Sequence, residues 1–533
     1  MVVILEELRR LLIPAGRSAR DAVWNSNLLL LAIASGFFLA LAASYATKSR
    51  QKMPPGPPGL PLVGNVLQLK NEQWFRFSEW RRTYGDIFTL NVLGQPMIVI
   101  NSYAIAADLL DRRANKFSDR PLNIVGCEIM SDGLMLAFSR YGERWRRMRK
   151  AAHEAVNKVP AHGLDEHLEV EALVLARSWL QDPSAWDYHL RRTAANTMFS
   201  SMYGDVPLGE ADAQFDFITQ YNEKITRAIA PGSYWVEILP WMRYIPSRFA
   251  PWKRVAEEWY QRANDFYMGL FERVHERIAS GSQPASFSST VLQDTHRHGL
   301  SPRENAWLVA GMFGAGAETT AAAMSWWTLA MLAHPEAQRR AQNELDSVVS
   351  RMRVPALADK ARLPYTMAMV KEVLRWRPVT PVGVPHGSVE NDIYNGYFIP
   401  KGALIIPNVW EMNNDPALFG ADAHSFNPAR YLNEQGQLVS GPPDTRDDGH
   451  FTYGFGRRIC VGKHVANNSL FIEIATCLWA FTLNNVKGQV VDVNAFHDEG
   501  IVVRPEPFQI EVEPRFPEAI ALLSQECELR GRR

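Results

Sequence analysis

Apolar side chains recur at close to every fourth position in the stretch after Gly462. This spacing is the period of one helix face, so it predicts a buried helix near the C-terminal end of the chain. The helix would begin directly after a glycine-rich loop, residues 453–462. Its periodic apolar positions are Ala466, Leu470, Ile474, Leu478 and Phe481.

A longer helix is predicted upstream, from Pro302 to Ala333. Ser301-Pro-Arg-Glu304 is a capping box with proline at the first helical position, and Pro335 ends the helix. About 33 residues at 1.5 Å each give roughly 50 Å. Its middle, Gly314 to Thr320, has two glycines that cost roughly 1 kcal/mol each against alanine. Small residues there allow a large ligand to lie against the backbone. The alternative is a close helix crossing.

The rest of the chain reads as mostly helical with a small β region. Alternating residues from Asp86 to Asn101, around Gly94-Gln95, predict a β-hairpin. Tyr103 to Asn115 is predicted to be helical, Phe117 to Phe138 irregular and apolar, and 165–278 a set of amphipathic helices.

The N-terminal region contains an uncharged run of 19 residues, Leu28 to Ala46. A membrane-spanning helix needs about 20 such residues, and a cleaved signal peptide has a shorter apolar region. A buried core helix is the alternative. Lys and Arg residues after the run favour a cytoplasmic C-terminal side, but arginines also precede it. Pro54 to Pro61 follows as a stiff proline-rich spacer.

These boundaries predict one large domain, because no long linker or repeat follows residue 65. The expected segments are 1–27, a transmembrane helix 28–46, a hinge 47–64, a catalytic domain 65–514 and a tail 515–533.

Composition narrows the functional classes only slightly. The chain has 533 residues with 57 Lys+Arg and 57 Asp+Glu, so net charge gives no reason to expect a nucleic-acid partner. Its four cysteines form neither a CxxC pair nor a disulfide-dense pattern. A reducing compartment is therefore expected.

The glycine-rich loop carries the candidate chemistry, because Cys460 lies in it just before a helix. We expect the helix dipole, Arg457 and Arg458 to favour a thiolate. Glycines let the backbone approach a flat ligand, and backbone N–H groups aimed at the sulfur would tune an attached metal. The composition fits a thiolate ligand to haem iron. A lone cysteine in a glycine turn is otherwise more often a small buried apolar residue.

The surrounding pattern decides between these interpretations. Tyr453-Gly-Phe-Gly-Arg-Arg-Ile-Cys-Val-Gly462 resembles the haem-binding loop of the cytochrome P-450 family. Tyr453 replaces the usual phenylalanine and adds a hydroxyl that needs a partner, and Val461 replaces a frequent proline. Neither change removes a ligand. The matched positions are Gly454, Gly456, Arg458, Cys460 and Gly462.

Four weaker motifs occur in the family's order, so the resemblance extends from Pro54 to about Pro514. They are Trp145 with Arg149, Ala315 to Thr319, Glu372 with Arg375, and Phe426 to Arg430. The resemblance implies the P-450 fold, mainly α with a small β region, preceded here by one transmembrane helix. It also implies haem b with Cys460 as the axial ligand to iron.

The resemblance further implies roles for individual residues. Trp145, Arg149, His386 and Arg458 would bind the haem, and Glu318 and Thr319 would deliver protons to oxygen through water. Glu372, Arg375 and Arg430 would form a structural triad. The expected substrate pocket is nearly all apolar, with small residues leaving room. Its residues are Leu134, Phe313, Gly314, Ala317, Val379, Thr380, Val384, Ile501 and Val502.

The function implied is insertion of one oxygen atom from O2 into a small apolar substrate. Electrons would come from a separate NADPH–cytochrome P-450 reductase, because the chain has no flavin or nicotinamide fingerprint. The overall pattern looks fungal, as in secondary metabolism, with a terpenoid substrate expected first and an aromatic polyketide, indole or sterol as alternatives. An oxygen-independent isomerase or dehydratase, or a haem sensor, fits Glu318-Thr319 less well. The expected location is the endoplasmic reticulum membrane, with the catalytic domain in the cytosol.

Overall fold

The structure is a computed structural model that describes residues 52–531 apart from 62, 70–71, 159–163, 205–212, 231, 443, 446 and 499. The predicted N-terminal segment and membrane helix, residues 1–46, lie outside the described residues. Within those residues, no helix is both long and apolar enough to cross a bilayer.

The chain divides into two compact units. The smaller unit includes a hairpin of β4 (Asp392–Tyr394) and β5 (Tyr397–Ile399), whose strands pair antiparallel. The larger unit comprises residues 55–391 and 400–533 and contains all the predicted site residues.

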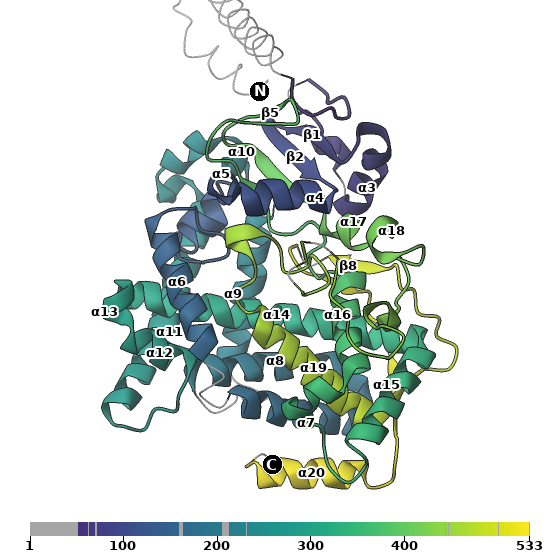
Figure 1. Cartoon of the computed structure of the whole chain (residues 1–533). Helices are drawn as coiled ribbons and strands as arrows, with labels where there is room; N and C mark the ends of the chain where they lie inside the picture. Colours follow the sequence, from purple (N-terminus) through teal and green to yellow (C-terminus); the bar gives the residue numbers. More distant parts are fainter. Residues whose placement is uncertain are drawn as a thin grey trace, which may run out of the picture. The chain divides into compact units, whose positions relative to one another are not determined.

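The larger unit is mainly helical (Figure 1). The prediction of a mainly α fold with a small β region is confirmed. Its α-helices are α3 (Gln73–Tyr84), α4 (Tyr103–Ala106), α5 (Ala114–Phe117), α6 (Glu143–Lys158), α7 (Leu164–Gln181), α8 (Trp186–Tyr203), α9 (Ala213–Ile229), α10 (Trp235–Ile238), α11 (Pro251–Ala279), α12 (Phe287–Gln293), α13 (Thr295–His298), α14 (Pro302–Ala333), α15 (Pro335–Val348), α16 (Pro364–Trp376), α17 (Val409–Asn413), α18 (Pro416–Phe419), α19 (Lys463–Ala480) and α20 (Ala519–Leu529).

The strands form one four-stranded sheet and short pairs. The predicted hairpin is confirmed as β1 (Ile87–Val92) and β2 (Gln95–Ile100), which pair antiparallel. β2 pairs parallel with β6 (Leu404–Pro407), and β6 pairs antiparallel with β3 (His386–Gly387). The remaining antiparallel pairs of this unit are β7 (Phe481–Asn485) with β10 (Ile510–Pro514), and β8 (Phe496–Asp498) with β9 (Val503–Pro505).

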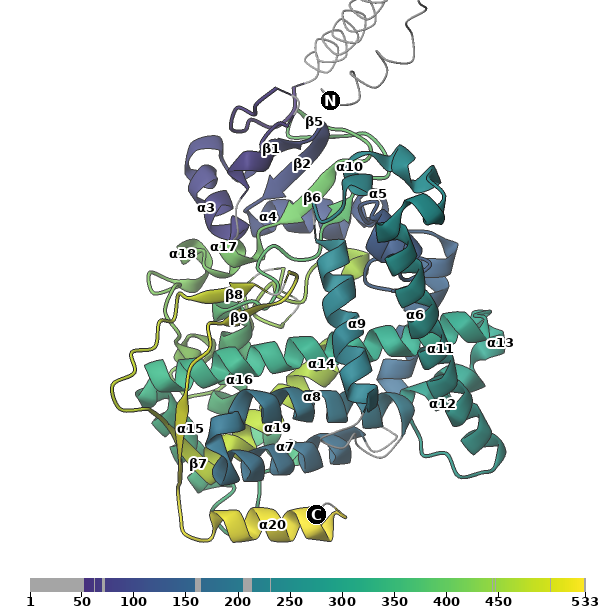
Figure 2. The same cartoon turned by 180° about the vertical axis from the view of Figure 1, so that it is seen from behind.

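Helix α14 runs across the helical body, with α8 packed along it (Figure 2). Its observed bounds, 302–333, confirm the predicted helix. Both capping-box hydrogen bonds are present, from the Ser301 N–H to Glu304 at 2.8 Å and from the Glu304 N–H to Ser301 at 3.2 Å. Trp307, Trp326 and Trp327 are buried and anchor both ends of the helix in the core.

The C-terminal tail is structured where it is described. Helix α20 packs against α7, with Leu523 and Cys527 completely buried. Arg530 adds an ion pair to Glu169 at 2.9 Å. Residues 519–529 therefore form a helix that packs on the core, which had not been predicted for the tail.

Candidate functional site

The loop before α19 depends on two glycines with left-handed backbone conformations. Gly454 has a φ of 76° and Gly456 a φ of 58°, which L side chains rarely adopt. A Cβ on Gly456 would also overlap the carbonyl oxygen of Leu110, and the Gly456 N–H donates to the Asp111 carboxylate. The loop is thereby pinned in place, and Cys460 follows it immediately before α19.

The sulfur of Cys460 stands apart from the other thiols of the protein. All four cysteines are free, and Cys460 alone among them is exposed. The surrounding protein still desolvates the sulfur and raises the pKa of the thiol, although the Gly462 N–H and the Arg149 guanidinium oppose that rise. A stable thiolate here therefore needs an electrophile bound to the sulfur, as a metal ion supplies.

The guanidinium groups of Arg457 and Arg458 hydrogen-bond other groups, so their expected effect on the thiolate stays a prediction. Arg457 donates to the Tyr141 hydroxyl. Arg458 donates to the carbonyl oxygens of Ser118 at 2.8 Å and Ser139 at 2.9 Å. The cations that act on the sulfur are Arg149 on α6 and Lys463 on α19.

Two residues on one face of α6 border the cysteine loop. Arg149 is half-buried and its Nη2 donates to the Ile459 carbonyl at 2.6 Å. Trp145 is buried, and its indole N–H donates to the Leu136 carbonyl at 3.2 Å. The Arg458 guanidinium lies over the Trp145 ring, 4.2 Å from its centroid. Because the Trp145 N–H is already engaged, its binding to a haem propionate stays a prediction.

A further buried cation, Arg120, was not identified from the sequence. Its Nη1 donates to the carbonyls of Val384 at 2.8 Å and Pro385 at 2.7 Å, and burial lowers its pKa to about 9. His386 lies nearby, with its Nδ1 2.8 Å from the Phe117 carbonyl. That oxygen can only accept, so Nδ1 carries the proton. Burial and the charge of Arg120 lower the pKa of His386 to about 3, so the ring is neutral.

Arg120, Arg149 and Arg458, here called the basic cluster, have little internal neutralisation. Burial, together with the charges of Arg120 and Arg149, lowers the pKa of Arg458 to about 8. Asp119 acts in the opposite direction on Arg120 and Arg458, but its carboxylate is held by Arg140 at 2.8 Å. The cluster is thus suited to a ligand with two negative charges, such as the propionates of haem.

The donor set around Cys460 therefore fits a haem group. A thiol that is exposed yet disfavoured as a free thiolate offers one iron ligand. The basic cluster offers positive charge for the two propionate carboxylates of haem. One of its members, Arg149, also acts on the sulfur of Cys460 and hydrogen-bonds the cysteine loop.

The acid and hydroxyl of α14 lie as neighbours with different partners. The Glu318 carboxylate is 3.0 Å from Arg504 on β9 and 3.8 Å from Arg191 on α8. The Thr319 hydroxyl donates to the carbonyl of Ala315 at 2.8 Å, one turn back in the helix. Arg504 and Arg191 are both distant from Glu318 in sequence, so these ion pairs could not be predicted.

In the middle of α14, from 311 to 319, Phe313 is buried and the other residues are at least partly accessible. Ala315 is exposed, and Gly311, Gly314, Glu318 and Thr319 are half-buried on the same side. The accessible residues lie between two mostly buried parts of α14, which packs against α19. A ligand can therefore approach the helix backbone at Ala315.

Phe313, a predicted pocket residue, packs within a helix crossing, and its contact with a substrate stays a prediction. Phe313 is 2% exposed, and its ring packs edge-on against Phe199 of α8 with centroids 6.1 Å apart. Gly316 serves the same helix crossing, because a Cβ there would lie 2.5 Å from Met198 Cε. Gly383 leaves no room either, since its Cβ would lie 3.1 Å from Pro407. Small size at both glycines serves packing.

The other predicted pocket residues differ in accessibility. Leu134, Val379 and Val502 are buried, and Ala317, Thr380, Val384 and Ile501 are half-buried. The Val503 N–H donates to the Val379 carbonyl at 2.9 Å, so the segments that carry Val502 and Val379 meet. Their contact with a substrate stays a prediction.

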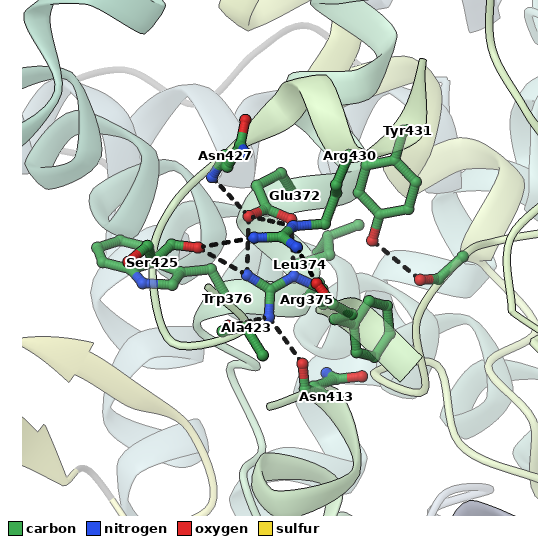
Figure 3. Close-up of polar contacts among 12 residues, drawn as sticks. Glu372, Leu374, Arg375, Trp376, Asn413, Ala423, Ser425, Asn427, Arg430 and Tyr431 are labelled. Carbon is green, nitrogen blue, oxygen red and sulfur yellow. Dashed lines mark hydrogen bonds and ion pairs between the residues drawn. The ribbon is translucent and has the colours of Figure 1, made fainter. Parts of the chain in front are cut away.

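The predicted triad is assembled in the core (Figure 3). Glu372 and Arg375 on α16 form two hydrogen bonds of 2.7 Å, and Arg430 Nε lies 3.1 Å from the same carboxylate. Arg375 also donates to the carbonyls of Asn413 and Ala423 at 2.7 and 2.6 Å. The triad thus holds the segment before the cysteine loop against α16.

Tyr453 finds the partner that its hydroxyl requires. It donates to Asn467 Oδ1 on α19 at 2.7 Å, and the Tyr453 carbonyl accepts from the Cys460 N–H at 2.9 Å. Asn467 also begins a formal glycosylation sequon, but its side chain is half-buried and bonded within the protein.

Comparisons with known proteins agree with this site. The sequence profile described as Cytochrome P450 matches residues 54–512. Two cytochrome P450 monooxygenases of Armillaria gallica are 51% and 50% identical, over 91% and 93% of this chain and 94% and 99% of their own lengths. Cytochrome P450 monooxygenase 58 of Postia placenta is 43% identical over 93% of this chain and 95% of its own length.

Proposed function

The chain belongs to the cytochrome P450 family of haem-thiolate monooxygenases, and from that premise we propose that its substrate is a bulky, neutral and mainly apolar molecule, a terpenoid in the first place. The observation that carries this proposal is the accessible side of α14. Its small apolar residues are Gly311, Gly314 and Ala315, beside Glu318 and Thr319, and the Glu318 carboxylate is occupied by Arg504. Such a surface binds a ligand by burial and offers no free charge to a charged one.

The residues around Cys460 would hold the cofactor. Cys460 is the thiolate ligand of the iron, and the basic cluster would bind the two propionates. When bound, haem supplies the activation of O2 that allows one oxygen atom to enter a C–H bond. The hydrogen bond from Arg149 to the Ile459 carbonyl ties the propionate side of the site to the cysteine loop.

Thr319 and Glu318 would transfer protons through water at the accessible side of α14. The Thr319 hydroxyl donates to the Ala315 carbonyl, which leaves its lone pairs to accept a hydrogen bond from a water molecule. Glu318 would pass protons to such a water when its carboxylate leaves Arg504. Thr319→Ala should therefore keep the haem but divert NADPH electrons to peroxide.

We also propose that a separate NADPH–cytochrome P450 reductase supplies the electrons, and that residues 28–46 anchor the protein in the endoplasmic reticulum membrane. The support is the uncharged 19-residue run and the exposed Arg144, Arg146 and Lys150 on α6, beside the cysteine loop. Protease added to intact microsomes should then digest the catalytic domain. Protection until detergent is added would reverse the orientation.

The direct test of the function is oxygen incorporation. The holoenzyme, reductase and NADPH are incubated under labelled O2 with terpenoids, aromatic polyketides, indoles and sterols. We expect one labelled oxygen atom in a terpenoid product. Product formed without O2 or NADPH would favour an isomerase or dehydratase, and a preferred organic cation or dianion would overturn the apolar site.

A further inference from the structure

Helix α9 crosses α14 at its accessible stretch (Figure 2), and two polar side chains mark this crossing. A Cβ on Gly314 would lie 3.0 Å from Asn222 Oδ1 and 3.3 Å from its Nδ2. A Cβ on Gly500, in the turn between β8 and β9, would lie 3.2 Å from Thr226 Cγ2. Asn222 and Thr226 are four residues apart, so they share one face of α9. That face therefore borders both α14 and the turn leading to Ile501.

Neither polar group is used to hold the fold together. Among the described residues, no side chain or backbone group hydrogen-bonds the Asn222 amide or the Thr226 hydroxyl, and both residues are half-buried. The amide and the hydroxyl are therefore free to bind an oxygen-bearing group of a ligand. The helix is seated by other residues, since Ile225 is buried and the Tyr221 hydroxyl donates to the Met130 carbonyl at 2.9 Å.

We propose that Asn222 and Thr226 form a polar recognition site that binds a hydroxyl or carbonyl oxygen of an otherwise apolar substrate. An amide and a hydroxyl each donate and accept, and neither is charged, so the pair suits an alcohol or ketone. Glu318, one turn from Gly314 on α14, is held by Arg504 and Arg191 and does not compete for this role. The site deepens the proposed function, since it selects among apolar substrates by one oxygen-bearing group.

The test compares alcohols with hydrocarbons of the same skeleton. Decalin with 2-decalol, and cedrane with cedrol, are titrated into the holoenzyme, and the shift of the haem absorption band gives each dissociation constant. One hydrogen bond corresponds to about a 3- to 10-fold preference. We expect the wild type to prefer the alcohol by this factor, and Asn222→Leu and Thr226→Val to reduce the preference while hydrocarbon binding stays.

Matched controls lie on the outer side of the same helix, where Thr219 and Gln220 are exposed. Thr219→Val and Gln220→Leu should keep the wild-type ratio. Gly314→Ala should weaken the preference, because the new Cβ crowds the Asn222 amide. A purely structural role for Asn222 would change stability but leave the alcohol-to-hydrocarbon ratio unchanged.

The outcome separates this proposal from the function it rests on. Each variant is first checked for haem content and for a thiolate-type carbon monoxide spectrum. A wild type without that spectrum contradicts the monooxygenase function itself. A haem-replete wild type with no alcohol preference in either pair, or variants that keep the full preference, would overturn the recognition site alone.

Discussion

Arg375 and Arg120 are both buried guanidinium groups, but they differ in what neutralises their charge. Burial opposes the charge of Arg375, yet the Glu372 carboxylate outweighs it and raises the pKa. Arg120 donates mainly to backbone carbonyls, and burial lowers its pKa to about 9. Backbone dipoles satisfy hydrogen bonds but carry no net charge, so only the triad is electrostatically complete within the protein.

The presence or absence of a carboxylate partner distinguishes a structural arginine from one that binds a ligand. A buried cation with its own carboxylate holds the fold, and removing one partner leaves an unpaired charge. A buried cation without one is compensated by a bound anion or by surrounding aromatic rings, as Arg377 is by Trp376 and Trp410. By this criterion the triad is structural, and the basic cluster is expected to bind a dianion.

The largest expected effect is at the triad. Glu372→Gln keeps the shape but leaves Arg375 and Arg430 without a carboxylate in the core. It should lower the free energy of unfolding of the holoprotein by about 3–5 kcal/mol, measured by denaturant titration. The matched control is Glu79→Gln, which breaks an exposed pair with Arg76 at 2.8 Å and the same three-residue spacing. Equal effects at both positions would contradict the comparison.

Glu473 is the acidic counterpart, a buried carboxylate without a cationic partner among the described residues. It lies near the buried Glu171, and Ser469 donates a hydrogen bond to it at 2.7 Å. Burial raises its pKa from 4.5 to about 7. The native state therefore holds the proton more tightly than the unfolded chain, and stability is lost as pH rises from about 4.5 to 7.

The expected loss is about 3 kcal/mol between pH 5 and pH 8, measured as the free energy of unfolding of the holoprotein at each pH. Glu473→Gln stays neutral throughout and should remove this contribution. Parallel pH profiles for wild type and variant would show that Glu473 is ionised at little cost in the native protein.

Substitutions in the basic cluster should change the rate of haem loss more than the free energy of unfolding. Arg120→Gln keeps a hydrogen-bond donor but removes the charge, so haem should be lost about 10- to 100-fold faster. The measurement is the rate of haem transfer to excess apomyoglobin. Arg144→Gln, at an exposed arginine of α6, should keep the wild-type rate. An unchanged rate in Arg120→Gln would remove Arg120 from the cofactor site.

The smallest effect is expected at a partly buried hydrogen bond between two uncharged side chains, Tyr453 and Asn467. Tyr453→Phe removes the hydrogen bond to Asn467 and should cost about 1 kcal/mol, seen as a lower melting temperature of the holoprotein. Tyr103 is the control, because its ring stacks on Phe451 with centroids 5.8 Å apart and its hydroxyl has no hydrogen-bond partner among the described residues. Equal shifts in Tyr103→Phe would show that the Asn467 bond contributes nothing.

Local signals in the sequence located the elements that carry the site. The capping box and Pro335 fixed the ends of α14, and the glycine pattern located the cysteine loop, because both depend on residues within one or two turns. The hydrogen bond from Arg504 to Glu318, in contrast, joins residues 186 positions apart, and Arg120 meets the carbonyl of Val384 across 264 positions. No periodicity in the sequence encodes such pairs.

Helix faces were predictable only where the pattern was one-sided. Apart from Glu318 and the threonines, the middle of α14 is small or apolar, so the pattern did not separate pocket from core positions. In the structure Phe313 packs against Phe199. The register of Asn222 against Gly314 likewise depends on how α9 crosses α14, which only the tertiary structure provides.

The most direct test of the account is the carbon monoxide spectrum of the reduced protein with and without Cys460. Wild type should show a thiolate-type band, and Cys460→His should lose that band while the basic cluster still retains haem, as measured by the haem-to-protein ratio. A thiolate-type band that persists in Cys460→His would mean that another residue ligates the iron and would contradict the assignment of the site.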